Sequence, residues 1–266
     1  MQRLADGRVV ALGERDCSVQ RRNQKVIEES ASPLLDPSQT EELKASAERL
    51  AIAVGYVGAG TVEFLYHPGE RSFAFLEVNT RLQVEHCVSE EVTGIDLVRE
   101  MFRIAAGEEL GYDDPEIRGH SIEYRINAED GGRNFMPAPG TLSAWSPPSG
   151  PGVRLDGGYE NGETIPGSFD SLIAKLVVWG SDREEARRRL IRALQETEIA
   201  GVKTTIPAHL AILEHPDFIE NRHSTRWVEE KLDFSDMPAV RAGAGAGQPA
   251  SGETPRNVAV EVDGRR

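Results

Sequence analysis

A short stretch of this sequence, FLEVNTRLQVEH at residues 75–86, gathers side chains that could do chemistry. Its polar members, mostly separated by apolar residues, are Glu77, Asn79, Arg81, Gln83, Glu85 and His86. Residues two apart in an extended chain project to the same face, so the alternation predicts a single polar face. There Arg81 would suit a small oxyanion, Gln83 would donate or accept hydrogen bonds, and Glu85 would serve as a general base. The pattern also fits an exposed strand edge with mixed charges.

A further glutamate, Glu63, lies in the run TVEFLY, which is followed by the loop HPGERS and the run FAFLEV. Two β-rich runs around such a loop predict an antiparallel hairpin, in which one register sets Glu63 directly opposite Glu77. Like charges about 4 Å apart repel by roughly 1 kcal/mol in water, so the pair indicates a bound cation. The two carboxylates and the amide oxygen of Asn79 suit Mg²⁺ or Mn²⁺. A register shifted by one residue would leave both glutamates as ordinary solvent-facing residues.

The first part of the chain predicts the elements that would position these residues. Asp6 and Gly7 predict a tight turn between two short strands. Asp36 followed by Pro37 predicts the start of an amphipathic helix that ends before Gly55. These elements precede the expected hairpin.

Later segments predict two more helices and two more strands. Helices are expected at residues 95–106 and at residues 182–196, the second opened by a capping box of Ser181 and Glu184. The runs HSIEYRINAE and SLIAKLVVW have the alternation or the apolar content of strands. Together with the hairpin, these elements predict an α+β fold.

The composition narrows the range of partners and compartments. The chain has 266 residues and a formal net charge of -14, which argues against nucleic acid or an anionic membrane as a non-specific partner. The sequence has neither an apolar run of the roughly 20 residues that span a bilayer nor a secretory signal at its start. It therefore predicts a cytoplasmic protein in which Cys17 and Cys87 are reduced thiols.

The last part of the chain changes in composition. Residues 241–255 are rich in Gly, Ala and Ser and predict a flexible linker. Residues 256–266 contain NVAVEVDGRR, which predicts the truncated start of a following domain.

Three motifs together carry a resemblance to a known family. EVNTRLQVEH, with ERDCSVQRRNQKVIEE upstream and RINAED downstream, resembles the biotin carboxylase family of ATP-grasp enzymes. The resemblance extends from about Met1 to Phe234 and implies the C-terminal half of the catalytic domain of a biotin-dependent acyl-CoA carboxylase subunit. It implies a partial ATP-grasp core at residues 1–107, mostly antiparallel sheet flanked by helices. Residues 108–240 would then form the biotin carboxylase C-terminal subdomain.

The resemblance implies ATP- and bicarbonate-dependent carboxylation of biotin on a carrier domain. The residues at the matching positions would bind ATP (Lys25, Glu63 and Glu77), hold Mg²⁺ or Mn²⁺ (Glu63, Glu77 and Asn79) and grip bicarbonate (Lys25, Arg81, Gln83 and the backbone of Val84). Glu85 would deprotonate bicarbonate, and Arg125 would stabilise the biotin enolate. A carboxyltransferase subunit or domain and a second copy of the chain are the further partners that the resemblance implies.

Two positions depart from the family pattern, since Asn23 stands where His is frequent and Cys87 where Pro is frequent. The family's N-terminal subdomain and mobile lid have no counterpart in the sequence, so this chain alone is expected to lack activity. One alternative is a non-catalytic dimerisation or scaffold fragment of such an enzyme. Another is a relative of carbamoyl-phosphate synthase, which RLQVEH and Arg125 disfavour.

Overall fold

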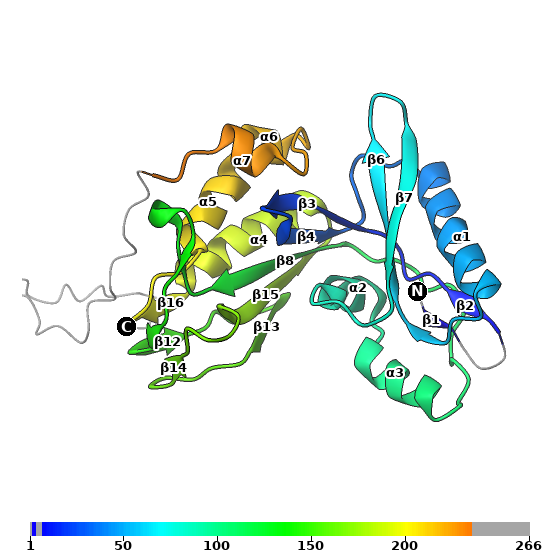
Figure 1. The fold of residues 1–266 in the computed structure, drawn as a ribbon, viewed down its shortest axis with the longest axis horizontal. Helices are drawn as coiled ribbons and strands as arrows, with labels where there is room; N and C mark the ends of the chain where they lie inside the picture. Colours follow the sequence, from blue (N-terminus) through cyan, green and yellow to red (C-terminus); the bar gives the residue numbers. More distant parts are fainter. Residues whose placement is uncertain (1, 4–6, 236–266) are drawn as a thin grey trace, which may run out of the picture.

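The computed structural model describes residues 2–3 and 7–235, which form an α+β fold of antiparallel sheets and helices (Figure 1). The fold class expected from the sequence is confirmed. The predicted linker at residues 241–255 and the following strand at residues 256–266 lie outside the described residues. None of the helices formed by the described residues is both long enough and apolar enough to cross a membrane.

A five-stranded antiparallel sheet forms the centre of the molecule. In spatial order its strands are β13 (Val153–Gly157), β15 (Leu172–Gly180), β8 (His120–Asn127), β4 (Gln24–Ser30) and β3 (Arg15–Arg21). The strands expected from HSIEYRINAE and SLIAKLVVW are thus confirmed as β8 and β15. The sheet takes β3 and β4 from before residue 107 and its other strands from after it, and a domain division at that residue stays a prediction.

Successive residues of β8 point to opposite faces of this sheet, and the two faces differ in chemistry. On one face, Tyr124 and Leu176 are fully buried in the main apolar core with Leu190 of α4 (Arg183–Glu196). The other face is covered by α2 (His86–Thr93), which contacts β4, β8 and β15. Here Val177 packs against Cys87 and Val88, beside charged side chains of the strands. The charged side chains on this face, between the sheet and α2, form part of the candidate site.

The hairpin expected at TVEFLY and FAFLEV is formed by β6 (Thr61–His67) and β7 (Ser72–Asn79), and its register pairs Glu63 with Glu77 as predicted. The register then shifts between Glu63 and Phe64, so that Phe64 pairs with Phe75. Leu76 is the extra residue of this β-bulge. The hairpin stands beside α1 (Pro37–Ala53) in Figure 1.

The predicted helix starts and stops are mostly correct. Asp36 caps α1 by accepting from the backbone N–H of Gln39. The helix expected at residues 95–106 is α3 (Leu97–Ala105), capped by Asp96. The capping box expected at Ser181 is wrong by one residue, because the extended Asp182 caps α4 and accepts from the N–H of Glu185.

The remaining elements are short or were not predicted. β1 (Gln2–Arg3) pairs with β2 (Val9–Val10), as expected of the first hairpin, whereas Asp6 of the predicted turn lies outside the described residues; β5 (Gly58–Ala59) pairs with β1. The other short strands are β9 (Glu129–Asp130), β10 (Met136–Pro137), β11 (Gly140–Thr141), β12 (Ala144–Ser146), β14 (Thr164–Ile165) and β16 (Glu198–Ala200). The helices not predicted are α2, a 3₁₀ turn at Gly131–Arg133, α5 (Ile206–Glu214), α6 (Pro216–Ile219) and α7 (Trp227–Lys231).

Candidate functional site

The carboxylates of Glu63 and Glu77 share one face of the hairpin, with Asn79 next to them. Asn79 Nδ2 donates to Oε1 of Glu63 at 3.1 Å and to Oε1 of Glu77 at 3.0 Å. Glu77 is exposed and Glu63 is half-buried, so the group is open to solvent on one side. Rotation of the Asn79 amide would turn its oxygen towards the same point. Two carboxylates and an amide oxygen around an open position fit the ligand preferences of Mg²⁺.

Lys25 and Gln83 connect the group formed by Glu63, Glu77 and Asn79 to the central sheet. Glu63 Oε1 accepts from Lys25 Nζ at 3.0 Å and from Gln83 Nε2 at 2.8 Å, and the same lysine donates to Glu85 Oε1 at 2.7 Å. Burial disfavours the charged lysine, but the neighbouring Cys17 and Glu85 and the hydrogen bonds from Lys25 to Glu85 and Glu63 outweigh it and raise the pKa of Lys25. Lys25 is therefore a fixed cation between two carboxylates.

Glu85 is almost completely buried and is held between two cations. Besides Lys25, it accepts from Arg125 Nη2 at 3.1 Å through Oε2, and Arg125 also donates to Glu28. Burial would raise the pKa of Glu85, but Arg15 and Lys25 outweigh burial, so the pKa lies below its ordinary value. Glu85 is thus ionised at neutral pH, which is the form that a general base requires.

The sequence-based expectation of one extended polar face is wrong beyond Asn79. Strand β7 ends at Asn79, and a turn at Val84 and Glu85 leads directly into α2. Arg81 is exposed and donates to Asn79 Oδ1 at 3.3 Å, whereas Gln83 and Glu85 are buried. A turn, rather than strand alternation, brings Glu85 back to the network.

Every predicted site residue is accounted for in this arrangement. Hydrogen bonds run from the exposed Arg81 to Asn79 and from Asn79 to both paired glutamates. They continue from Glu63 to Lys25 and through Glu85 to Arg125. The backbone carbonyl of Val84 accepts from Lys175 Nζ at 2.9 Å, which fixes the turn. A cavity of about 320 Å³ adjoins the network, with Lys25, Glu63 and Glu85 on its polar wall and Leu43, Ala47 and Leu76 on its apolar wall.

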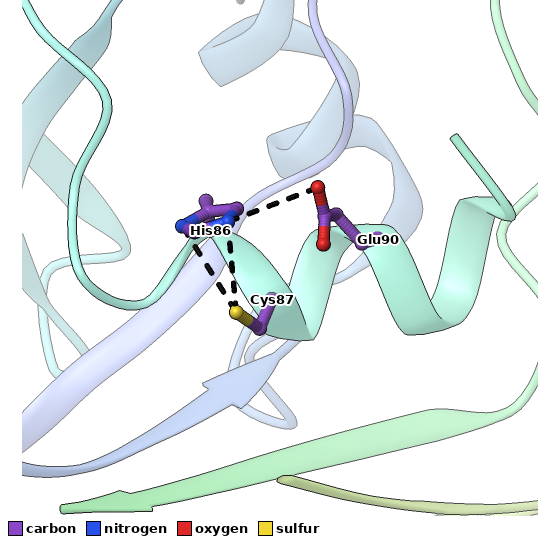
Figure 2. A group of neighbouring side chains, drawn as sticks. All are labelled: His86, Cys87 and Glu90. Carbon is purple, nitrogen blue, oxygen red and sulfur yellow. Dashed lines mark hydrogen bonds and ion pairs between the residues drawn. The ribbon is translucent and has the colours of Figure 1, made fainter. Parts of the chain in front are cut away.

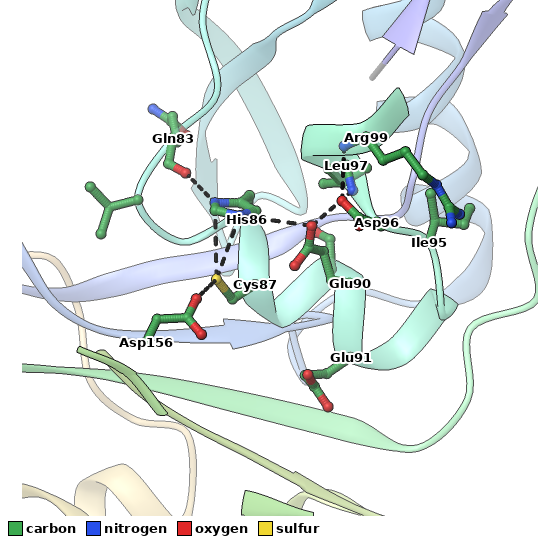
Figure 3. A network of polar contacts seen from close by, with 12 residues as sticks. Gln83, His86, Cys87, Glu90, Glu91, Ile95, Asp96, Leu97, Arg99 and Asp156 are labelled. Atoms are coloured by element: carbon green, nitrogen blue, oxygen red, sulfur yellow. Dashed lines mark hydrogen bonds and ion pairs between the residues drawn. The ribbon is translucent and has the colours of Figure 1, made fainter. Parts of the chain in front are cut away.

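A second polar group lies at the start of α2, where ligand atoms of His86, Cys87 and Glu90 are within 4.8 Å of one another (Figure 2). Figure 3 places it among its neighbours, where Nδ1 of His86 lies 2.9 Å from the carbonyl oxygen of Gln83 and Cys87 Sγ lies 3.1 Å from Asp156 Oδ2.

Cations also surround the thiol of Cys87. Lys175 Nζ lies 2.8 Å and Arg154 Nη2 3.4 Å from Sγ, and Arg154 bridges Glu90 to Asp156. Positive charges this close oppose a further cation. Because Arg154 pairs the carboxylates of Glu90 and Asp156, the group acts as an ionic link between α2 and the sheet. A metal is expected at the hairpin instead, where Glu77 is exposed.

The two departures from the family pattern have local structural consequences. Asn23 and Arg22 form the turn between β3 and β4 with φ values of 62° and 50°. Positive φ at both central residues is typical of a type I′ hairpin turn, and asparagine tolerates it better than most residues. Cys87 is fully buried, and burial raises the pKa of its thiol to about 12. Both cysteines are free thiols, as the sequence predicts.

Sequence reasoning missed three charged residues of this network. Arg15 donates to Gln83 Oε1 at 3.2 Å, and Glu28 accepts from Arg125. Glu123 lies beside them in β8 and is fully buried. The only signal in the sequence was a charged residue inside each strand-forming run, which is also typical of a solvent-facing strand position.

Family models match both parts of the described chain. Residues 1–112 match the model described as carbamoyl-phosphate synthase L chain, ATP binding domain, and residues 123–230 match the biotin carboxylase C-terminal domain. The chain belongs to the biotin carboxylase family and has its ATP-grasp-like fold. The second match removes the alternative of a carbamoyl-phosphate synthase relative.

The relatives agree with this membership. The chain is 49% identical over 275 residues to the biotin-dependent acyl-coenzyme A carboxylase alpha3 subunit of Mycobacterium leprae, a match that covers 100% of this chain and 45% of that protein. It is 49% identical over 233 residues to biotin carboxylase 1 of Bacillus subtilis, covering 86% of this chain and 52% of that protein. The chain thus spans about half the length of these curated relatives.

Solved structures give the same result. One is the biotin carboxylase domain dimer of Hydrogenobacter thermophilus 2-oxoglutarate carboxylase, in complex with MgADP, ADP and bicarbonate. It has a TM-score of 0.86 and 44% identity over 89% of this chain and 52% of that one. A biotin carboxylase from Campylobacter jejuni in complex with β,γ-ATP has a TM-score of 0.83 and 45% identity, covering 86% of this chain and 51% of that one.

Proposed function

We propose that this chain supplies part of the catalytic site of a biotin carboxylase, which carboxylates carrier-bound biotin with ATP and bicarbonate. The observation that carries the proposal is the position of Glu85, an ionised and buried carboxylate held by Lys25 at 2.7 Å and by Arg125 at 3.1 Å. A base between two cations suits a substrate that is itself an anion, because the cations offset the repulsion between the base and bicarbonate.

In the proposed reaction, Lys25, Arg81, Gln83 and the backbone of Val84 hold bicarbonate, and Glu85 accepts its proton. The oxygen that loses the proton attacks the γ-phosphorus of ATP, so that ADP leaves and carboxyphosphate forms. Carboxyphosphate then splits into CO₂ and phosphate, the phosphate accepts the ureido N–H proton of biotin, and the deprotonated nitrogen attacks CO₂ to form carboxybiotin. Arg125 stabilises the negative charge on the ureido oxygen of biotin during this last step.

The proposed ligands of Mg²⁺ or Mn²⁺ are Glu63, Glu77 and Asn79. The proposed ATP-binding residues are Lys25, Glu63 and Glu77. The bound cation would offset negative charge on the nucleotide phosphates. Complexes of relatives with MgADP and bicarbonate support this assignment. The apolar wall of the adjoining cavity offers space for the nucleotide base.

We also propose which complete enzyme this chain belongs to and which partners that enzyme has. The match of the whole of this chain to part of an acyl-coenzyme A carboxylase subunit supports an acyl-CoA carboxylase. A biotinylated carrier domain and a carboxyltransferase are its proposed partners, in the cytoplasm. The dimer named for the Hydrogenobacter relative supports a homodimer. Residues 1–107 would form the ATP-grasp part and residues 108–240 the C-terminal subdomain. Because the chain spans about half of its relatives, we assign activity to the complete carboxylase rather than to residues 1–266 alone.

Transfer of radioactive bicarbonate to free biotin tests the proposed function. Residues 1–266 would be combined with a polypeptide that supplies the other half of a biotin carboxylase, and ATP would be added or withheld. We expect ATP-dependent carboxybiotin from the mixture and none from either part alone. A correctly folded mixture that binds both substrates but never carboxylates biotin would favour the scaffold alternative.

Replacing Glu77 with glutamine is expected to weaken Mn²⁺ binding to this chain about 10- to 100-fold. Loss of a residue that only hydrogen-bonds a metal ligand commonly weakens metal binding by that factor. Because Glu77 is proposed as a ligand itself, its loss should have at least this effect. Titration of Mn²⁺ followed by electron paramagnetic resonance measures the affinity. Glu70→Gln, at the exposed tip of the same hairpin, is the matched control. Equal Mn²⁺ affinities of the two variants would contradict the assignment.

A further inference from the structure

Two glutamates to which the proposed reaction gives no role stand opposite each other in the five-stranded sheet. Glu28 of β4 and Glu123 of β8 are cross-strand partners, and each is 0% exposed. Directly opposed residues in an antiparallel ladder have their Cβ atoms about 4.5–5.5 Å apart. The two carboxyl groups are therefore enclosed together, on the sheet face that α2 covers.

Three of the four carboxyl oxygens of this pair have no hydrogen-bond donor among the described residues. Arg125 donates to Oε1 of Glu28, but Oε2 of Glu28 and both carboxyl oxygens of Glu123 are buried without a hydrogen-bond partner. A buried polar group left unsatisfied costs about 1–3 kcal/mol, and more if it is charged. A proton between the two carboxyl groups would supply a donor that neither the backbone nor the neighbouring side chains provide.

The charged and titratable groups facing the pair come from every neighbouring element. They are Cys17 of β3, Lys25 of β4, Glu85 of the turn, Cys87 of α2, Arg125 of β8 and Lys175 of β15. The two lysines are engaged elsewhere, because Lys25 Nζ contacts Glu63 and Glu85 while Lys175 Nζ contacts the Val84 carbonyl and Cys87. Arg125 is thus the only one of these cations with a hydrogen bond to the pair among the described residues.

Burial acts on both carboxyl groups in the same direction. It raises the pKa of Glu28 to about 7 despite the neighbouring Arg125, and it raises the pKa of Glu123 far above its ordinary value, with the charge of Glu28 adding to the effect. Two carboxyl groups on directly opposed residues and without solvent do not both ionise at neutral pH. The proton belongs mainly on Glu123, because Glu28 has the arginine.

We propose that Glu28 and Glu123 share one proton in the folded protein, and that the singly charged pair is a positioning device that holds the Arg125 guanidinium beside Glu85. Glu123 donates to Oε2 of Glu28, and the remaining negative charge on Glu28 matches the single positive charge of Arg125. The guanidinium then spans Glu28 and Glu85 through one nitrogen, Nη2. Only the consequence for biotin carboxylation rests on the function proposed above, whereas the shared proton does not.

Isotope-edited infrared spectroscopy of residues 1–266 tests the shared proton without any activity. With ¹³C-labelled glutamate, we expect a carbonyl band of a protonated carboxylic acid at neutral pH in the wild-type protein and in Glu116→Gln, an exposed control. The band should be lost in Glu123→Gln and kept in Glu28→Gln, where the buried Glu123 still favours its protonated form. Persistence of the band in Glu123→Gln, or its absence from the wild-type protein, would overturn the proposal.

The pH dependence of stability is a second test, because it reads the same proton from the unfolding equilibrium. A carboxyl group whose pKa is raised by folding, as burial raises that of Glu123, binds more protons in the folded state than in the unfolded state. Its stabilising effect is complete below the ordinary pKa and is lost as pH rises through the folded value. We expect the thermal midpoint of Glu123→Gln to rise relative to the wild-type protein as the medium becomes alkaline. A constant difference would contradict the shared proton.

Activity then separates the two residues within the complete carboxylase. In Glu123→Gln the new side-chain amide can still donate to Glu28, so this variant should keep carboxybiotin formation and retain it at higher pH than the wild-type enzyme. Glu28→Gln removes the carboxylate that holds Arg125 and should lower carboxybiotin formation at least tenfold, with a smaller change in bicarbonate-dependent ATP cleavage. If both variants lose both activities equally, the positioning role is wrong. If the infrared band behaves as expected but no carboxylation occurs in any protein, the proposed function alone fails.

Discussion

Replacement of Glu85 with glutamine in the complete carboxylase is expected to lower bicarbonate-dependent ATP cleavage about 10²- to 10⁴-fold, the usual contribution of a positioned general base. Glu85 is the buried carboxylate between Lys25 and Arg125, and a glutamine there accepts no proton at neutral pH. Because deprotonation of bicarbonate precedes or accompanies attack on ATP, carboxybiotin formation should fall by at least the same factor. Rates of ADP and carboxybiotin release at saturating ATP measure both.

The matched control for this variant is Glu91→Gln, which removes a half-buried carboxylate from the helix that begins just after Glu85. Glu91 pairs with Arg154, away from the proposed substrates, so both rates should stay close to those of the wild-type enzyme. If Glu85→Gln folds normally and cleaves ATP at the wild-type, bicarbonate-dependent rate, then Glu85 is not the base.

Replacement of Arg125 with glutamine should separate the two half-reactions. Removing one preorganised donor that stabilises a developing anion typically costs about 2.7–4 kcal/mol, a factor of roughly 10² to 10³ in rate. We expect that loss in carboxybiotin formation, because the ureido oxygen becomes anionic only after ATP has been cleaved. ATP cleavage should fall much less. The rates of carboxybiotin formation and of ATP cleavage are measured on one preparation, and their ratio should be lower than in the wild-type enzyme.

The competing interpretation makes Arg125 a structural partner of the buried Glu28. Removing one member of a buried ion pair commonly costs about 3–5 kcal/mol of folding free energy, so that interpretation predicts a lower thermal midpoint and a parallel loss of both activities. Arg125→Lys, which keeps the positive charge, should recover part of the carboxylation rate under our assignment. A stable Arg125→Gln protein whose two activities fall by equal factors would rule the assignment out.

Local patterns predicted much of the site. Parity along two strands predicted the pairing of Glu63 with Glu77 and left a one-residue slip open, and the structure has the paired register. Capping chemistry placed the start of α1 at Asp36, because the carboxylate and the following proline act within one turn. These features depend on neighbours within a few residues, which a single sequence displays.

What the sequence did not show depends on contacts between distant segments. The bulge at Leu76 and the turn at Val84 and Glu85 have no strong local signal, so the polar residues after Asn79 were expected in one extended face. Glu28 and Glu123 follow the alternation of ordinary solvent-facing positions, and they are buried only because α2 covers that face of the sheet. Neither could be recognised as part of the site before α2 itself was placed.

The central sheet joins strands that are far apart in the chain, since the Arg125 guanidinium meets a glutamate 97 positions earlier. Closing so large a loop costs chain entropy before the first stabilising contact is made, and folds rich in such pairings reach the native state slowly. The β6–β7 hairpin needs only a short loop and would form early. During folding, the paired glutamates of the hairpin would therefore be in place before β4 docks on β8, and the general base would gain its two cationic neighbours only at that late step.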